Sequence, residues 1–129
     1  MEIKIWEGGL QAQEVAAIEK IKKAFAPLPN TKGKSMFPWK GYAGFRFVDA
    51  SGYEGEFDLV IITHCNVLII ELKDWNNAEI RSEGDKWYKN NYLMGRSPVS
   101  VTRNKKFQLD NKLKRLKHNF TNKGYAPFV

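Results

Sequence analysis

Two apolar runs separated by three residues dominate the middle of the chain. The first, residues 56–63, reads EFDLVIIT, and the second, residues 67–73, reads VLIIELK. Short runs this rich in Val and Ile are typical of buried strands. The intervening HCN leaves room only for a tight hairpin. We therefore expect two antiparallel neighbouring strands in the core of a sheet.

Three charged side chains lie in this hairpin, although a charge beside a packed core is costly unless it is paired, binds a metal or takes part in chemistry. Asp58 follows the start of the first run, and Glu71 and Lys73 end the second. Strand side chains alternate between faces, so Glu71 and Lys73 share one face of their strand. The conflict between burial and charge marks these residues as a candidate site.

The length of the loop sets the expected register. A two-residue loop at Cys65 and Asn66 pairs His64 with Val67. Asp58 then lies directly opposite Lys73, with the glutamate as its diagonal neighbour on the same face. Two carboxylates and an ammonium group are thus predicted to converge at one end of an apolar sheet.

Two carboxylates a few ångströms apart repel each other unless a cation lies between them. Mg²⁺ suits such a site, because it takes one or two carboxylates and keeps several waters; Mn²⁺ is the expected substitute. We expect Asp58 and Glu71 to bind the metal, with the backbone carbonyl of Leu72 as a further ligand. Lys73 can orient or deprotonate the attacking water, or offset charge on the phosphoryl group.

Asp followed by Glu-x-Lys on two paired strands resembles the PD-(D/E)xK nuclease superfamily. More narrowly, GEFDLVII followed by VLIIELKDW resembles the nuclease-related domain (NERD), with its Gly-Glu-φ-Asp and φ-φ-Glu-x-Lys-x-Trp patterns, φ being aliphatic. The matching residues are Gly55, Glu56, Asp58, Glu71, Lys73 and Trp75. A Gly-x-Ser-Pro element at residues 95–98 is also similar to the family. The residue before Asp58 is Phe57 rather than Pro.

This resemblance implies a restriction-endonuclease-like core and metal-dependent cleavage of DNA or RNA. It also implies that a glutamate on the first helix, here Glu14, assists the metal site. A glutamine often found after the Ser-Pro element is not at that spacing, and the next polar candidates are Asn104 and Gln108. Members of the family often lie beside helicase, kinase or topoisomerase-type zinc domains, and nucleases of the superfamily often form homodimers.

The order of the remaining elements predicts an α/β fold. Residues 8–25 and about 99–120 have the apolar spacing of helices, residues 43–50 that of a strand, and residues 77–91 that of a hairpin turning at 83–85. We expect a central mixed sheet flanked by an N-terminal and a C-terminal helix. The 129 residues suit one domain. The apolar ending GYAPFV suggests that it belongs to a longer protein.

The formal net charge of +7 favours a polyanionic partner. Between residues 103 and 117 the second helix carries seven basic residues and one acid. We expect phosphate contacts from this helix and from the loop at residues 30–42, which mixes Lys with aromatic residues. The predicted contact residues are Lys105, Lys106, Lys112, Arg115, Lys34 and Lys40.

No apolar run approaches the roughly 20 residues that cross a membrane, and the N-terminus lacks the apolar segment of a secretory signal. The single cysteine, Cys65, excludes an internal disulfide. A cytoplasmic location is the simplest expectation.

Simpler interpretations stand beside these. Asp58 could cap a strand end, Glu71 and Lys73 could be solvated, and Glu14 could be a surface acid. His64 and Cys65 are expected to be structural, and Trp75 to be a packing residue. The chain could also be a non-cleaving nucleic-acid-binding module of a larger enzyme, or a purely structural or protein-interaction domain.

Overall fold

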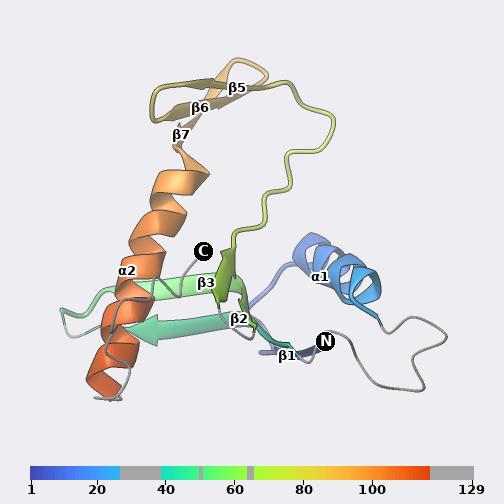
Figure 1. The fold of residues 1–129 in the computed structure, drawn as a ribbon. Helices are drawn as coiled ribbons and strands as arrows, with labels where there is room; N and C mark the ends of the chain where they lie inside the picture. Colours follow the sequence, from blue (N-terminus) through green and yellow to red (C-terminus); the bar gives the residue numbers. More distant parts are fainter. Residues whose placement is uncertain (27–38, 50, 64–65, 117–129) are drawn as a thin grey trace.

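The computed structural model describes residues 1–26, 39–49, 51–63 and 66–116. Its main sheet is mixed: the outer strand β1 runs parallel to β2, whereas β2–β3 and β3–β4 are antiparallel. The strands, in their order across the sheet, are β1 (Glu2–Ile5), β2 (Lys40–Val48), β3 (Glu54–Ile62) and β4 (Val67–Ile70). The helices are α1 (Ala12–Ala24) and α2 (Pro98–Leu116). The predicted mixed α/β fold with two flanking helices is confirmed (Figure 1).

Alternating residues of β3 supply the cores on the two faces of the sheet. Leu59 and Ile61 are buried against Ile18 of α1. Val60, which points the other way, packs with Leu109 of α2. Period-two alternation of apolar residues on both faces is what a central strand covered by helices requires. The hairpin strands are therefore the middle layer between two helices, as their continuous apolar runs predicted.

The start of α1 is fixed by a close approach of backbone to backbone. A Cβ atom added to Gly9 would lie 1.7 Å from the carbonyl oxygen of Gly44 in β2. Gly44 itself has φ +69°, in the left-handed region that favours glycine. This contact sets where α1 begins, and so where its first turn, which contains Glu14, lies against the sheet.

A second sheet lies beyond the long segment that leaves β4 (Figure 1). It consists of β5 (Ile80–Glu83), β6 (Lys86–Lys89) and β7 (Tyr92–Arg96), all antiparallel. The predicted hairpin at residues 83–85 is confirmed by the pairing of Glu83 with Lys86. Trp75 of the connecting segment packs against Trp87, with ring centroids 6.0 Å apart, so its predicted packing role is confirmed.

Several predicted boundaries were wrong. The first helix begins at Ala12 rather than at residue 8, because Gly8 adopts a left-handed φ of 74°. Residues 40–42, predicted as loop, belong to β2, and residues 30–38 of that loop lie outside the described residues. Strand β4 ends at Ile70 rather than at residue 73. The second helix is described from Pro98 to Leu116, and its predicted remainder lies outside the described residues.

Two short strands, β1 and β7, were not predicted at all. In the described part of the chain, no helix is both long enough and apolar enough to span a membrane.

Replacing Gly9 by alanine should destabilise the fold. Because the new methyl group meets backbone rather than a movable side chain, α1 must shift away from β2. We expect a loss of about 1–3 kcal/mol in the free energy of unfolding, the usual cost of overpacking. Urea denaturation followed by circular dichroism measures it. The exposed Glu7→Ala variant is the control and should change stability by less than about 0.5 kcal/mol. A Gly9→Ala protein as stable as the control would contradict the contact.

Candidate active site

Asp58 lies in β3 at the point where β4 leaves it. The last pair of the β3–β4 ladder is Leu59 with Ile70. The next available backbone amide, that of Leu72, donates to Asp58 Oδ2 at 2.7 Å. A carboxylate thus takes the place of a backbone partner, which explains why β4 ends before Glu71. Asp58 also lacks a pair with Gly44 in the β2–β3 ladder, although the residues on both sides of it are paired.

The predicted register of the hairpin was wrong. Val67 pairs with Ile62 rather than with His64, so the pairing is displaced by two residues. Continued past Leu59 and Ile70, this register sets Asp58 across from Glu71 rather than from Lys73. A displacement of two residues keeps every side chain on its predicted face. The convergence of the two carboxylates therefore survives the error.

Glu71 is held between two lysine ammonium groups. Its Oε1 accepts from Lys73 Nζ at 2.6 Å, and its Oε2 accepts from Lys105 Nζ at 2.5 Å. The Glu71 and Lys105 side chains are only 12% and 14% exposed, whereas Lys73 is 40% exposed. One partner therefore comes from the same strand end and faces solvent, and the other reaches over from α2 and is nearly enclosed.

The two carboxylates have opposite electrostatic environments. Burial is the main cause that raises the pKa of Asp58 above its ordinary value, and the negative charges of Glu71 and Glu14 add to it. Burial also pushes the pKa of Glu71 upward, but hydrogen bonds from Lys105 and Lys73 outweigh it and leave that pKa below the ordinary value. Among the described residues, Glu71 is thus paired with two ammonium groups, whereas Asp58 forms no ion pair and the charge of Lys105 only partly offsets the rise in its pKa.

Glu14 lies on the α1 side of the same cluster. Its charge is close enough to raise the pKa of Asp58, and it lines a cavity of about 270 Å³ together with Leu72 and Lys73. Its Oε2 also accepts from the backbone amide of Gln11 at 2.8 Å, which closes the first turn of α1. The structure therefore brings Glu14 to the predicted site and also gives it a helix-capping contact.

The donor set suits a cation that needs few protein ligands. Among the residues that the structure describes, no group of three or more His, Cys, Asp or Glu side chains is arranged to hold a metal ion. Mg²⁺ typically uses one or two carboxylates and fills its other positions with water and substrate oxygens. The raised pKa of Asp58 marks a place where added positive charge is favourable. Asp58 and Glu71 thus fit Mg²⁺ or Mn²⁺. The Leu72 carbonyl stays a predicted ligand.

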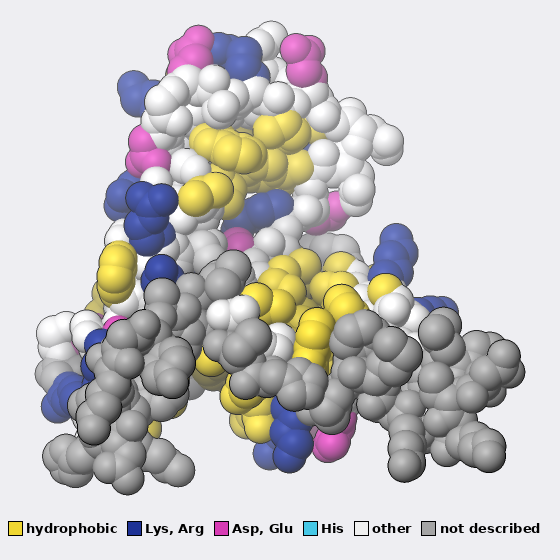
Figure 2. All heavy atoms as spheres, in the orientation of Figure 1, with side chains coloured by type: hydrophobic (Ala, Val, Ile, Leu, Met, Phe, Trp, Pro, Cys, Tyr) yellow, Lys and Arg dark blue, Asp and Glu magenta, His cyan; other side chains and the backbone are white. Residues whose placement is uncertain are grey.

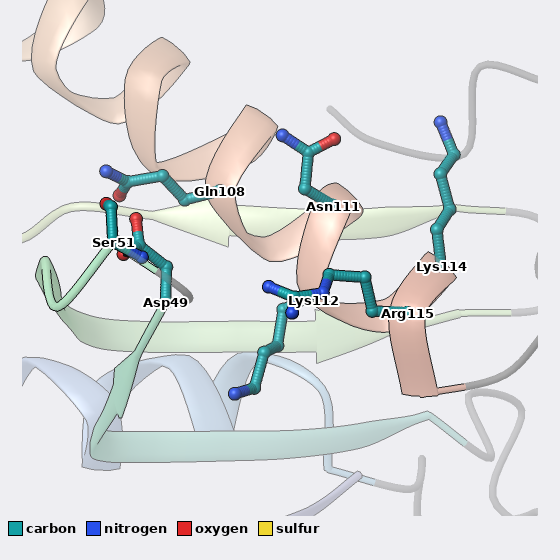
Figure 3. A pocket seen from close by; sticks show the side chains of 7 residues that line it. All are labelled: Asp49, Ser51, Gln108, Asn111, Lys112, Lys114 and Arg115. Atoms are coloured by element: carbon teal, nitrogen blue, oxygen red, sulfur yellow. Dashed lines mark hydrogen bonds between the residues drawn. The ribbon is translucent and has the colours of Figure 1, made fainter.

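Basic residues follow the side of the molecule formed by α2 (Figure 2). Arg103 and Lys106 line a cavity of about 360 Å³ that reaches Glu71. Further along, Lys112 and Arg115 line a second cavity, of about 430 Å³, with Asp49 and Ser51 of the β2–β3 turn (Figure 3). Cavities flanked by cations thus lie at two places along the helix.

The other predicted nucleic-acid contacts differ in position. Lys112 Nζ donates to the Val48 carbonyl at 3.0 Å, which holds α2 to the end of β2. Lys40 pairs with Ile62 at the far end of β3, away from the carboxylates. Lys34 lies outside the described residues, as do His64 and Cys65. None of these positions tests nucleic-acid binding, which stays a prediction.

Two features of α2 were missed by sequence reasoning. Lys105 was predicted as a phosphate contact, yet its ammonium group lies on Glu71. The side-chain oxygen Oε1 of Gln108 is buried and has no hydrogen-bond partner among the residues that the structure describes. The side chain extends from α2 toward the turn that holds Asp49 and Ser51 (Figure 3). The spacing of Lys105, Gln108 and Lys112 by three and four residues puts all three on one stripe of the helix, which was the available signal.

Comparison with known proteins agrees with this geometry. The family model of the nuclease-related domain (NERD) matches residues 11–129. A stretch of 50 residues is 32% identical to a protein of Streptomyces coelicolor named "Probable kinase PglW", covering 39% of this chain and 3% of that protein. No solved structure gave a significant match. The family model covers nearly the whole chain, including strands β3 and β4, both helices and the carboxylate cluster. The chain therefore belongs to the nuclease-related domain family.

Proposed function

We propose that this domain is a nuclease that hydrolyses phosphodiester bonds in DNA or RNA and depends on Mg²⁺, with Mn²⁺ as a substitute. The observation that carries the proposal is the cluster itself: where β4 leaves β3, two partly buried carboxylates have opposite pKa shifts, and one of them, Glu71, is paired with Lys73. Membership of the nuclease-related domain family supports phosphodiester hydrolysis as the type of reaction.

In this proposal each residue of the cluster has its own role. Asp58 and Glu71 hold the metal, with the Leu72 carbonyl as an additional ligand and Glu14 contributing negative charge from α1. Bound there, Mg²⁺ supplies a coordinated water of lowered pKa and offsets charge on the phosphoryl group. Lys73, which is the more exposed of the two lysines on Glu71, orients the attacking water or stabilises the transition state.

The nucleic acid is bound through its phosphates along α2. Arg103 and Lys106 lie beside Glu71, where they can hold the phosphates next to the cleaved bond. Lys112 and Arg115 line the more distant cavity and can hold the strand further along. Such contacts are independent of base sequence and weaken steeply with salt. A homodimer and a cytoplasmic location belong to the same proposal. So does attachment to further domains, which the match inside a much longer protein supports.

A second candidate function is nucleic-acid binding without cleavage. It is favoured by one observation: both oxygens of Glu71 already accept from ammonium groups, so that carboxylate is neutralised without a metal. A binding module would use α2 in the same way but would need neither Asp58 nor Lys73. The two functions therefore differ in what these residues contribute.

Cleavage should depend on both the metal and Lys73. Labelled single- and double-stranded DNA and RNA are incubated with the protein and Mg²⁺, Mn²⁺ or EDTA. We expect products only with metal, and a loss of about 10²–10⁴-fold in rate for Lys73→Ala, the usual contribution of a positioned proton-transfer group. Asp58→Asn should be at least as impaired. Glu56→Gln, an exposed acid paired with Arg46 two residues from Asp58, is the matched control and should retain activity.

Metal-independent cleavage, or equal rates for Lys73→Ala and Glu56→Gln, would contradict the nuclease proposal. Salt-sensitive binding without any cleavage would support the binding module.

Nucleic-acid affinity should depend on the far end of α2. The double variant Lys112→Ala/Arg115→Ala should bind single-stranded DNA more weakly. In a plot of the logarithm of the binding constant against the logarithm of the salt concentration, its slope should be shallower by about 1.4. Each lost phosphate contact on a single strand removes about 0.7 from this slope. Fluorescence anisotropy in EDTA at several salt concentrations measures both. The control, Lys22→Ala/Lys23→Ala, removes the same charge from the last turn of α1 and should leave the slope unchanged. Equal slopes in the two double variants would contradict a phosphate-binding role for α2.

A further inference from the structure

Lys105 occupies one carboxylate oxygen of Glu71, a predicted metal ligand. It lies 2.5 Å from Glu71 Oε2, comes from a helix 34 residues away in sequence, and is 14% exposed. Lys73 already provides the ammonium group of the Glu-x-Lys motif on the other oxygen. The site therefore has one more cation than the proposed chemistry requires.

The charge of Lys105 acts on the whole cluster. It lowers the pKa of Asp58 as well as that of Glu71. A divalent cation between these two carboxylates would meet the ammonium group at short range, and like charges that close repel strongly. A lysine ammonium sits on a flexible four-carbon stem, so it can leave the carboxylate if another anion receives it. The cavity beside Glu71, lined by Arg103 and Lys106, is where a phosphate would offer that anion.

We propose that Lys105 is a resident counterion of the carboxylate pair. It competes with the divalent cation for Glu71, and it transfers to a phosphate of the nucleic acid when metal and substrate bind together. This inference rests on the proposed function. It implies that metal binding and nucleic-acid binding strengthen each other, because each favours the position of Lys105 that the other needs.

A structural role makes a different prediction. If the ion pair only clamps α2 to the end of β4, its loss destabilises the fold and leaves the affinity for metal unchanged. The two roles are separated by measuring metal binding directly, without reference to cleavage.

The probe is Mn²⁺, whose free concentration is read from its electron paramagnetic resonance signal. Lys105→Met should bind Mn²⁺ about tenfold more tightly than the unmodified protein, within the 5- to 150-fold range of typical coupled sites. Lys114→Met is the matched control, because Lys114 is also an α2 lysine paired with a carboxylate, that of Asp110 at 2.8 Å. Its Mn²⁺ affinity should stay within about twofold of that of the unmodified protein, well below the typical range for coupled sites.

Glu71→Gln, which removes a predicted metal ligand, should bind Mn²⁺ weakly. Thermal unfolding checks the fold, and Lys105→Gln, which can still donate to Glu71, replaces the Met variant if that protein does not fold.

A short oligothymidylate should raise the Mn²⁺ affinity of the unmodified protein and have little effect on that of Lys105→Met. Equal Mn²⁺ affinities of these two proteins, with Glu71→Gln still weak, would overturn the counterion role and leave the metal site standing. An equal effect of the oligonucleotide on both would overturn the transfer to phosphate. Absence of Mn²⁺ binding in every protein, Lys105→Met included, would overturn the inference together with the proposed metal-dependent function.

Discussion

The hydrogen bond from the Leu72 amide to the Asp58 carboxylate determines where the β3–β4 pairing ends and the carboxylate cluster begins. It replaces the backbone pair that would have continued the ladder beyond Leu59 and Ile70. The chain is released from β3 at that point and continues toward the second sheet (Figure 1). Since residues 71–73 no longer pair as a strand, the Glu71 and Lys73 side chains are held by each other and by α2 rather than by a ladder. The paired part of the sheet thus ends where the carboxylate cluster begins.

Each helix directs one charged side chain toward this release point, from opposite faces of the sheet. α1 brings Glu14 close enough to affect the charge of Asp58, and α2 brings Lys105 onto Glu71. The packing that places them is ordinary: Ile18 against Leu59 and Ile61 on one face, Leu109 against Val60 on the other. A buried apolar core on both faces therefore fixes a polar cluster between them, and the polar groups need not supply the stability themselves.

Local patterns were enough for the parts of the fold that repeat along the sequence. The apolar runs of the hairpin, the stripes of both helices and the turn before Lys86 were all predictable, because each depends on neighbours a few residues apart. Strand β1 was not, because four alternating residues are too short to give a strong signal and their partner, which begins at Lys40, is far away in the sequence. β7 was also missed, although Asn90 and Asn91, which adopt left-handed conformations in its turn, are residues typical of such turns. Lys105 was recognised as basic, but its place on a helical stripe with Gln108 and Lys112 does not by itself show which lysine of α2 reaches Glu71.

The carboxylate cluster was predicted correctly from a register that was wrong, and the reason is general. Side chains alternate with a period of two, so an even displacement of one strand against another changes partners without changing faces. The observed displacement is two residues, which exchanges Lys73 for Glu71 opposite Asp58 and leaves all three on the predicted side. An odd displacement would have carried Glu71 to the face of α1, where Leu68 and Ile70 pack with Ile18. The apolar alternation of β4 excludes that arrangement, so the residues that build the core also determine which charged groups meet.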